Sequence, residues 1–510
     1  MTVLADGAWH RLHPASPLLK GGLFLLVIIG WVVTSLKDRV TGLFVTPDEG
    51  EAQYHDDAIT FIYEHNYLGL ALVGLLLVLA LVVGGFALSW RMHTFRITDE
   101  SVEVRSGVIF RSNRKARLDR VQGIQVTRPF VARLVGAAKL EISQAGRDAN
   151  VHLYYLHSNE ADAFRLEILR LASGTKNAAS GVMPETAALA PVSGLLDRRV
   201  AELLGPDRDI AAVAPASIVT IPPGRLLGSL VLESSAVIVL LAVIAAILAV
   251  PIFHNPTIML VALAVIFAVV SDRVKHFTRS ARYSIAGTPD GVRIGFGLLS
   301  TSSETLPPGR IHSIEVGQNL LWRGVGWWHL RVNRASHTAT GGASNQANSL
   351  VLPVGTRDDV DRVLSITLPD TIDVATAAII RSAIVSPGSD EFTTTPRRAR
   401  FMRPFSWRRN GFLLLPGLVI FRRGVLLRRL IIVPLSRMQA VSVAQGPLNR
   451  ILRLATIDLI TVAGPIRAHL GAIECTQAIE FFHAVSVHTS TAGQLDDSHR
   501  WRTNEQRDSL

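Results

Sequence analysis

A threefold internal repeat is the feature that most constrains the fold of this chain. Three glycines are each followed thirteen residues later by an arginine, and a second arginine comes thirteen residues after the first. Apolar residues between and beyond these arginines match without gaps. The matched sets are Gly107, Gly297 and Gly424; Arg120, Arg310 and Arg437; Arg133, Arg323 and Arg450; Ile124, Ile314 and Val441; and Val126, Val316 and Val443. Such self-similarity predicts three copies of one folding unit.

The repeated unit is predicted to be mostly β-structure. Matched apolar residues such as Leu140 and Ile142 are two positions apart, which is the period of a half-buried strand. The repeated glycine suits a hairpin turn, where a positive φ is cheap only for glycine. An amphipathic helix is expected to close each unit, at residues 161–172, 357–366 and 474–486. The pattern therefore predicts an antiparallel β-sandwich or barrel with a closing helix.

Four apolar stretches predict membrane-spanning helices in addition. Only 18% of the 510 residues are charged, against about 25% in soluble proteins, and the mean hydropathy is +0.32. The stretches are residues 21–36, 67–90, 226–253 and 257–270. The fourth is shorter than the roughly 20 residues that a crossing helix needs. The sequence PIFHNP between the third and fourth predicts a tight turn, so the expected fold class is mixed, with two transmembrane α-helical hairpins and three β-units.

The charges around these stretches predict an orientation. Acidic residues crowd the segment between the first two stretches, whereas arginines and lysines flank the other ends. Because positive charge stays on the cytoplasmic side, both termini and all three units are expected in the cytoplasm. Glu233 lies inside the third stretch, about two helical turns after Arg225. A paired structural role near the interface is favoured for Glu233, and a functional role is left open.

Two of the repeats carry a family resemblance. The sequence GVIFRSNRKARLDRVQGIQVTRPFVARLVGAAKLEISQAG at 107–146 resembles the bacterial PH-domain family, and GVLLRRLIIVPLSRMQAVSVAQGPLNRILRLATIDLITVAG at 424–464 resembles it more closely. The second copy departs from it at His312 and by an insertion from His337 to Ser349. Paired apolar stretches before such units resemble YdbS/YdbT-like multi-pass membrane proteins. The resemblance implies seven strands in two orthogonal sheets capped by a helix, a location in the bacterial inner membrane, and no catalytic residues.

The resulting domain organisation alternates apolar segments, units and linkers. Two segments rich in small and polar residues are interpreted as linkers, and the polar C-terminal residues as a disordered tail. The expected order is a hairpin over 18–90, a PH-like unit over 91–171, a linker over 172–222, a second hairpin over 223–272, a second unit over 273–370, a linker over 371–396, a third unit over 397–486 and the tail over 487–510.

Arginines gather in the third unit without a single acidic residue between them. They are Arg397, Arg398, Arg400, Arg403, Arg408, Arg409, Arg422, Arg423, Arg428, Arg429, Arg437, Arg450 and Arg453. Basic segments near a bilayer are attracted to anionic lipid. The candidate membrane-surface or partner contacts are therefore Arg422, Arg423, Arg428, Arg429, Arg408, Arg409 and Trp407. An ordinary solvated basic face remains the alternative. Nucleic acid is not expected, because neither a recognition helix nor a stacking groove is evident.

No motif in the sequence indicates an enzyme. The chain lacks phosphate-loop, metalloprotease and nucleophile-elbow signatures, and Cys475 is its only cysteine, which excludes internal disulfides. No cofactor and no metal are expected. The sequence predicts a non-catalytic membrane scaffold that binds an unidentified protein or anionic lipid headgroups and that could form a homo-oligomer. The alternative is a subunit of an oligomeric transporter or export system.

Overall fold

The computed structural model describes most of the three units. The described residues are 7–16, 87–107, 111–144, 150–172, 218–233, 256–288, 291–307, 309–335, 349–369, 372–386 and 391–494, with a few isolated positions between these ranges. The predicted linker 172–222 and the tail 487–510 lie largely outside them, as does nearly all of the predicted first hairpin.

Unit 1 contains seven strands and a closing helix. Its first four strands form one sheet, in chain order, and its last three strands are neighbours, again in chain order, in a second sheet. The elements are β1 (His10–Arg11), β2 (Thr94–Ile97), β3 (Ser101–Ser106), β4 (Ser112–Arg117), η1 (Leu118–Arg120), β5 (Val121–Arg128), α4 (Phe130–Leu134), β6 (Ala137–Gln144), β7 (Val151–His157) and α5 (Ser158–Ala172).

Unit 2 repeats this order and carries helical residues between its first two strands, of which the structure describes the helices α8 and α10. A further helix, α13, follows the closing helix α12. The elements are β8 (Val219–Thr220), α8 (Pro223–Val231), α10 (Pro256–Ser280), β9 (Ser284–Thr288), β10 (Gly291–Phe296), β11 (Thr301–Leu306), β12 (Ser313–Gln318), η3 (Leu321–Arg323), β13 (Trp328–Asn333), β14 (Leu350–Gly355), α12 (Arg357–Thr367) and α13 (Val374–Val385). Thr356 and Asp359 form a reciprocal capping box at the start of α12.

Unit 3 has the same order again. The arginine-rich residues 396–410 stand between its first two strands, which is where α8 and α10 stand in unit 2. The elements are β15 (Thr393–Thr394), η4 (Arg397–Phe401), β16 (Gly411–Leu415), β17 (Leu418–Arg423), β18 (Arg428–Pro434), η5 (Leu435–Arg437), β19 (Ala440–Ala444), α14 (Pro447–Ile451), β20 (Leu454–Ile460), β21 (Ala468–Glu474) and α15 (Cys475–Gln494).

The predicted threefold repeat is confirmed. Gly107, Gly297 and Gly424 each follow the third strand of their unit, and all three have positive φ, at 103°, 113° and 76°. A Cβ on Gly297 would lie 1.9 Å from the carbonyl oxygen of Ser300, and one on Gly424 2.0 Å from that of Leu427. The hairpin turn therefore requires glycine, as the sequence pattern indicated.

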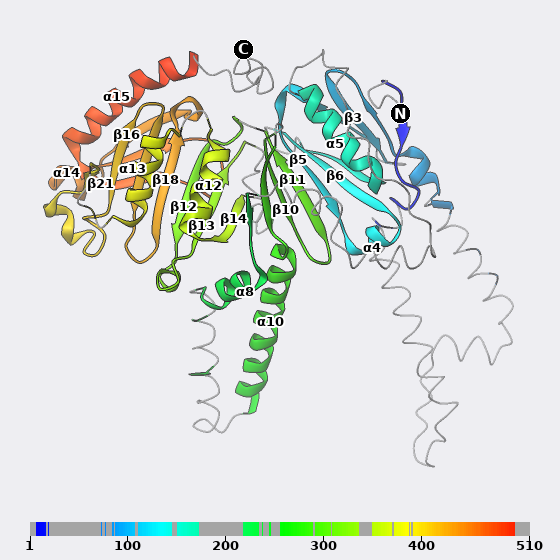
Figure 1. Cartoon of the computed structure of the whole chain (residues 1–510), viewed down its shortest axis with the longest axis horizontal. Coiled ribbons are helices and arrows are strands. Elements are labelled where there is room, and N and C mark those ends of the chain that lie inside the picture. Colours follow the sequence, from blue (N-terminus) through cyan, green and yellow to red (C-terminus); the bar gives the residue numbers. More distant parts are fainter. Residues whose placement is uncertain are drawn as a thin grey trace.

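The units share their sheets, which the repeat alone did not predict. β5 of unit 1 pairs with β11 of unit 2, and β12 of unit 2 pairs with β18 of unit 3, both antiparallel. Each junction, called a seam below, thereby builds one seven-stranded sheet from halves of two units. The three units lie in a row, with unit 1 in blue and cyan at one end and unit 3 in yellow and red at the other (Figure 1).

Sheet sharing buries β17 and β18 of unit 3 on both faces. Leu430 and Ile432 of β18 belong to the core of unit 2, whereas Ile431 and Val433 belong to the core of unit 3. The helix α13 contributes Ile380, Ala383 and Ile384 to the unit 2 core. This arrangement explains why β18 reads as a continuous apolar run rather than an alternating one.

The prediction of two transmembrane hairpins is wrong. Among the described residues, no helix is both long enough and apolar enough to cross a membrane. The helix α10 is the longest of them, but its apolar part, residues 256–271, is shorter than roughly 20 residues. Asp272, Arg273 and Lys275 follow directly, within the same helix. The described architecture is instead a set of antiparallel sheets with packed helices.

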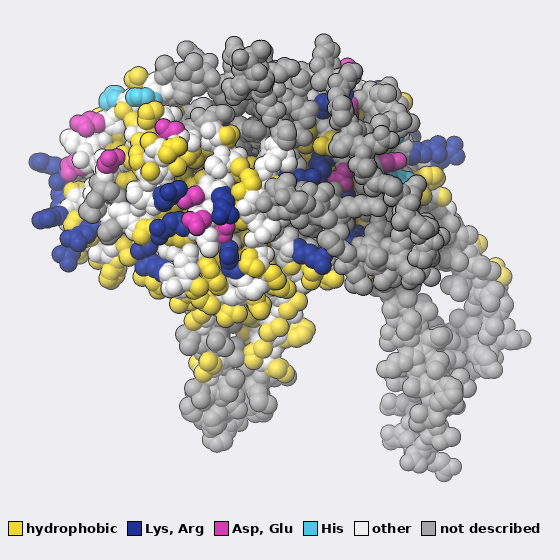
Figure 2. Space-filling view, viewed as in Figure 1, with side chains coloured by type: hydrophobic (Ala, Val, Ile, Leu, Met, Phe, Trp, Pro, Cys, Tyr) yellow, Lys and Arg dark blue, Asp and Glu magenta, His cyan; other side chains and the backbone are white. Residues whose placement is uncertain are grey.

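Exposed apolar side chains form a band along one side of the row of units, called the apolar margin below. At each seam, the turn after the fifth strand of one unit and the third hairpin of the next expose large apolar residues. Figure 2 shows this yellow band at the lower border of the central part, continuing onto α10, with Lys and Arg side chains above it. Its members are Phe130, Val131, Leu134, Val135, Leu298, Leu299, Leu320, Leu321, Val325, Leu426 and Leu427, with Leu227, Val231, Leu263, Phe267, Val270 and Val274 on α8 and α10.

Candidate functional site

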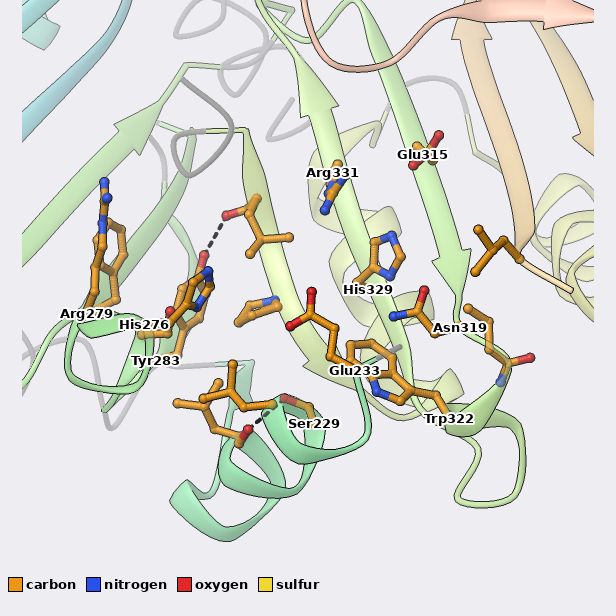
Figure 3. Close-up of a pocket in the computed structure, with 18 of the residues that line it drawn as sticks. Ser229, Glu233, His276, Arg279, Tyr283, Glu315, Asn319, Trp322, His329 and Arg331 are labelled. Carbon is orange, nitrogen blue, oxygen red and sulfur yellow. Dashed lines mark hydrogen bonds between the residues drawn. The ribbon is translucent and has the colours of Figure 1, made fainter. Parts of the chain in front are cut away.

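A cleft of about 470 Å³ lies where α8 and α10 meet the second seam. α8 contributes Leu226 and Ser229, and α10 contributes Lys275 and Arg279. The opposite wall comes from the second sheet of unit 2 and from the β17–β18 hairpin of unit 3. Figure 3 shows the side chains of both walls directed toward the same space. The wall residues from the seam are Glu315, Gln318, Asn319, Trp322, His329, Arg331, Leu427, Arg428 and Arg429.

Aromatic and uncharged groups form the inner wall of the cleft. The ring of His329 lies against Gly317, where a Cβ would come within 2.4 Å of it. Trp322 packs edge-on against His329, with ring centroids 5.9 Å apart. Burial lowers the pKa of His329 to about 3, and the charges of Arg331 and Arg429 act in the same direction. The imidazole is therefore neutral at physiological pH.

Cations outnumber anions around the cleft. Lys275, Arg279, Arg331, Arg428 and Arg429 line it, against the carboxylates of Glu233, Asp272 and Glu315. Two of these carboxylates already have partners, because Glu233 pairs with Arg273 and Glu315 lies 3.8 Å from Arg429. The ion pair of Glu233 agrees with the paired structural role that its sequence context favoured.

Several buried donors in the cleft have no acceptor. Within the described part of the chain, the Nε1 of Trp322 and the Nε atoms of Arg331 and Arg428 make no hydrogen bond. Buried donors without partners are costly unless a ligand or water accepts from them. The excess of donors and of positive charge suits an oxygen-rich anionic group, which a phosphate or carboxylate provides.

The burial of His329 predicts a pH-dependent stability. In the unfolded chain, this histidine has a pKa near 6.5, whereas in the folded chain its pKa is about 3. Between these two pH values, the unfolded chain therefore binds a proton that the folded chain does not bind. The free energy of unfolding should therefore be highest above pH 6.5 and fall as the pH is lowered, by about 2 kcal/mol at pH 5. Burial lowers the pKa of His312 to about 4 and adds to this trend.

His329→Gln tests this prediction by urea denaturation at pH 5, 6 and 7. The variant should lose most of the His329 contribution and show a shallower fall than the parent chain. His276→Gln, at an exposed position on the same cleft, is the matched control. An unchanged pH dependence in His329→Gln would contradict the assignment.

Of the seven candidate contact residues, the structure places two in the cleft. Arg428 donates to Oε1 of Gln318 at 3.4 Å, and Arg429 pairs with Glu315. Arg423 is half-buried and donates to the carbonyl of His469 at 3.1 Å. The role of these residues as surface contacts stays a prediction.

Two other candidates are buried. Arg422 is fully buried, lies 4.2 Å from the ring of Phe392 and donates to the carbonyl of Arg409 at 3.0 Å. Arg409 is buried as well and donates to the carbonyl of Ile384 at 2.8 Å. Arg409 thereby ties unit 3 to the end of α13, and Arg422 supports the backbone of Arg409, so both have a structural task.

The last two candidates lie away from the cleft. Arg408 is exposed and lies over the half-buried ring of Trp407, at 5.3 Å. They follow η4, where Phe401 and Phe405 are 88% and 79% exposed. This segment thus presents aromatic and basic side chains together, the combination that favours a membrane interface.

Sequence reasoning missed most of the cleft. Lys275, Arg279, Trp322 and His329 come from segments that only the seam and the α8–α10 insertion bring together. The one available signal was the aromatic cluster LWRGVGWWHL in the second copy, and the sequence pattern did not connect it with a site.

The matching family agrees with the three units. The profile described as bacterial PH domain matches residues 23–172, 227–371 and 372–488. The chain belongs to the bacterial PH domain family. The first PH match ends at the last residue of the closing helix α5, the second ends a few residues after α12, and the third ends within α15. No curated protein matches the chain.

Membership in the bacterial PH domain family supports a coarse functional conclusion. The family is generally non-enzymatic, and PH domains typically bind lipids or proteins. Three such units indicate a binding role for the chain. The likeness to YdbS/YdbT-like membrane proteins remains a resemblance.

Proposed function

We propose that this chain is a non-catalytic binding protein that lies on the inner face of a bacterial membrane and holds an anionic lipid headgroup in the cleft between α8, α10 and the second seam. The apolar margin then dips into the membrane interface. The three units in a row remain available as a scaffold for protein partners. On the described residues, no observation favours the transporter alternative.

The observation that carries this proposal is the continuity of the cleft with the apolar margin. Leu427 belongs to both, and the helices α8 and α10 line the cleft with one face and expose apolar residues with another. Contiguous exposed apolar surface rimmed by polar residues marks a membrane or protein contact. A lipid combines an anionic head with an apolar tail, so it can satisfy both features at once.

The basic residues near the margin favour an anionic membrane surface. Lys and Arg side chains lie directly above the apolar band (Figure 2), and each one close to an anionic surface contributes about 1 kcal/mol of attraction. Apolar and basic groups arranged in this way place the apolar side chains below the headgroups and the charges among them.

Vesicle sedimentation with the full chain tests the proposal. We expect binding to vesicles that contain anionic lipid, much weaker binding to neutral vesicles, and a steep decrease with salt, because exposed charge is screened over about 8 Å at physiological ionic strength. Lys275→Gln with Arg279→Gln should weaken the binding. Arg467→Gln, an exposed position in unit 3 outside the cleft and the margin, is the control. Equal binding to neutral vesicles would contradict the proposal.

A further inference from the structure

The two seams use the same pair of strands, and in the described residues the two outer units each have one strand of that pair without a partner on its outer edge. At both seams the fifth strand of one unit pairs with the fourth strand of the next. Among the described residues, the outer edges of β4 in unit 1 and of β19 in unit 3 have no partner strand, because β4 pairs with β3 alone and β19 with β20 alone.

The open edge of β19 carries none of the features by which proteins protect exposed strands. Its sequence is AVSVA, without charge or proline, and its pairing with β20 runs without a bulge from Ala440 to Ala444. Natural edge strands usually carry lysine, proline or a bulge that prevents further pairing. An unprotected regular edge is suited to accept another strand.

The charges of β4 do not prevent it from being that strand. Lys115 already pairs with Glu103 at 3.1 Å, and Arg117 pairs with Asp119 at 2.8 Å. The equivalent strand β18 begins with Arg428 and pairs with β12 across the second seam. Basic residues at this position are therefore compatible with seam formation.

We propose that copies of this chain join head to tail, by antiparallel pairing of β19 in one copy with β4 in the next. The existing seams fix the register. Ser302 lies opposite Thr127 at the first seam, and Arg429 lies opposite Gly317 at the second, at the same repeat positions. The same positions place Ser112 opposite Ala444, and Arg114 opposite Ser442. Such a heterologous contact gives a ring or a filament.

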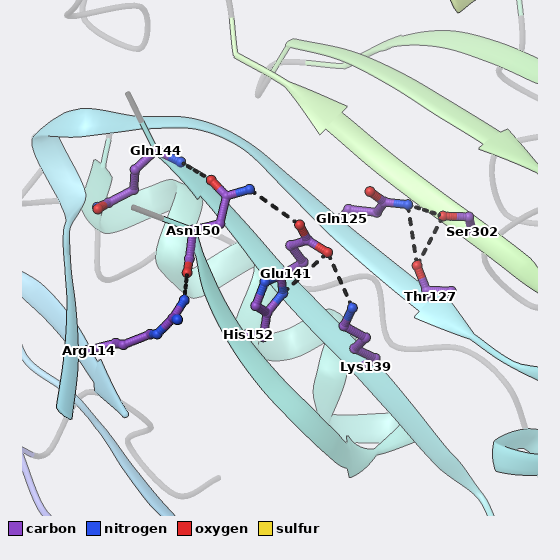
Figure 4. A network of polar contacts seen from close by, with 9 residues as sticks. All are labelled: Arg114, Gln125, Thr127, Lys139, Glu141, Gln144, Asn150, His152 and Ser302. Atoms are coloured by element: carbon purple, nitrogen blue, oxygen red, sulfur yellow. Dashed lines mark hydrogen bonds and ion pairs between the residues drawn. The ribbon is translucent and has the colours of Figure 1, made fainter. Parts of the chain in front are cut away.

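Side-chain contacts at the first seam show that this register brings side chains of the two paired strands within hydrogen-bond distance. Gln125 donates to the hydroxyl of Ser302 at 2.8 Å, and the hydroxyl of Thr127 lies 3.2 Å from it (Figure 4). In the intermolecular seam, Ser442 pairs on its other side with Asp458 of β20. Arg114 of the next copy would thus approach an acidic neighbour, which favours the contact.

Within the part of the chain that the structure describes, the turn after β19 has no counterpart of the hairpin that its equivalent contacts. At the second seam, Arg323 donates to the carbonyl of Leu426 in the next unit at 3.2 Å. The equivalent residue in unit 3, Arg450, is exposed, and the neighbouring Ile451 is 79% exposed. A following copy would supply the missing hairpin at this place.

Disulfide cross-linking of the full chain tests the register. Ser112→Cys and Ala444→Cys are combined in a chain whose single native cysteine is changed, Cys475→Ser. Mild oxidation in the absence of vesicles should give a ladder of multimers from the double variant. A mixture of the two single variants should give dimers and nothing larger, because each chain then carries one cysteine and can form only one disulfide. Ser112→Cys with Ala440→Cys, about 13 Å out of register on the same face of the strand, is the control.

Charge at Ser442 gives an independent measurement. Ser442→Lys places a like charge opposite Arg114 and should weaken association in sedimentation by roughly threefold, whereas Ser442→Asp should strengthen it by a similar factor. Ser442 is exposed, so both variants should fold. A chain that stays monomeric with no ladder overturns the proposal. Dimers of equal yield from the single variant Ala444→Cys also overturn it, because they indicate symmetric pairing of β19. These outcomes do not depend on lipid, so they are independent of the vesicle test.

Discussion

Asparagine at Leu321, Val325 and Leu426 is expected to weaken binding of the full chain to anionic vesicles by about a hundredfold. These side chains meet at the second seam and are 39%, 50% and 59% exposed. If each buries its apolar surface in the membrane interface, it contributes about 1 kcal/mol. Three of them then contribute about 3 kcal/mol, which corresponds to roughly two orders of magnitude in affinity.

The control for this variant carries the same changes at exposed apolar positions outside the margin. Val374 on α13 and Ile479 and Val487 on α15 are 89%, 47% and 65% exposed. Asparagine at these three positions should leave vesicle binding within a factor of about two. Thermal unfolding should be similar for both variants, because all six side chains are exposed. Equal loss of binding in both would contradict a specific role of the margin.

The internal architecture of each unit could be predicted because it depends on local periodicity. Pairs such as Ile124 and Val126 repeat in all three copies, and the hairpin glycines have no steric alternative. The first repeated arginine of unit 2, Arg310, donates to the carbonyl of Asp119 at 3.0 Å. That bond crosses the first seam, which the repeat did not indicate.

The seams could not be predicted, because nothing local distinguishes a strand that pairs within a unit from one that pairs between units. β11 reads TSSETL, a polar pattern typical of an exposed strand, yet all six residues are buried. Its hydroxyl groups hydrogen-bond across the seam to Gln125 and Arg165. The polar sequence reflects satisfied buried groups rather than exposure to water.

The burial of the arginine cluster could not be predicted from the sequence either, because it also depends on contacts between units. A run of arginines without acids is typical of an exposed basic face, but Arg409 is buried against α13 of the preceding unit, and Arg422 is buried against Phe392 and the backbone of Arg409. Changing Arg422 together with its neighbours would therefore disturb folding as well as any membrane contact. Substitutions that probe binding belong at exposed residues such as Lys275 and Arg279.

The apolar stretches were misread for a different reason. Hydropathy alone does not distinguish a spanning helix from one whose apolar face is exposed beside a domain. The helix α10 keeps Leu263, Phe267 and Val270 exposed next to the cleft. Its charged second half continues into the unit 2 sheet. In the fourth predicted stretch, the described exposed side chains therefore belong to the apolar margin, whereas the first stretch and most of the second and third lie outside the described residues.

Replacing Arg334 by alanine is expected to destabilise the chain by about 3–5 kcal/mol. Arg334 and Glu304 form an ion pair in which the two side chains are only 2% and 4% exposed. The guanidinium lies under the first seam, where its Nη1 would be 3.5 Å from a Cβ on Gly123 of β5. Removing the arginine leaves a buried carboxylate without its partner, which is the costly case for buried ion pairs.

Urea denaturation of three variants separates this cost from a general effect of losing an arginine. Arg117→Ala removes an exposed pair with Asp119, whose side chains are 60% and 58% exposed, and should cost less than about 1 kcal/mol. Arg334→Met combined with Glu304→Leu removes both buried charges and should recover most of the stability lost in Arg334→Ala, since apolar groups of similar volume replace a desolvated pair at little cost. If Arg334→Ala is no more destabilising than Arg117→Ala, the buried pair does not hold unit 1 to unit 2, and the first seam depends on its strand pairing alone.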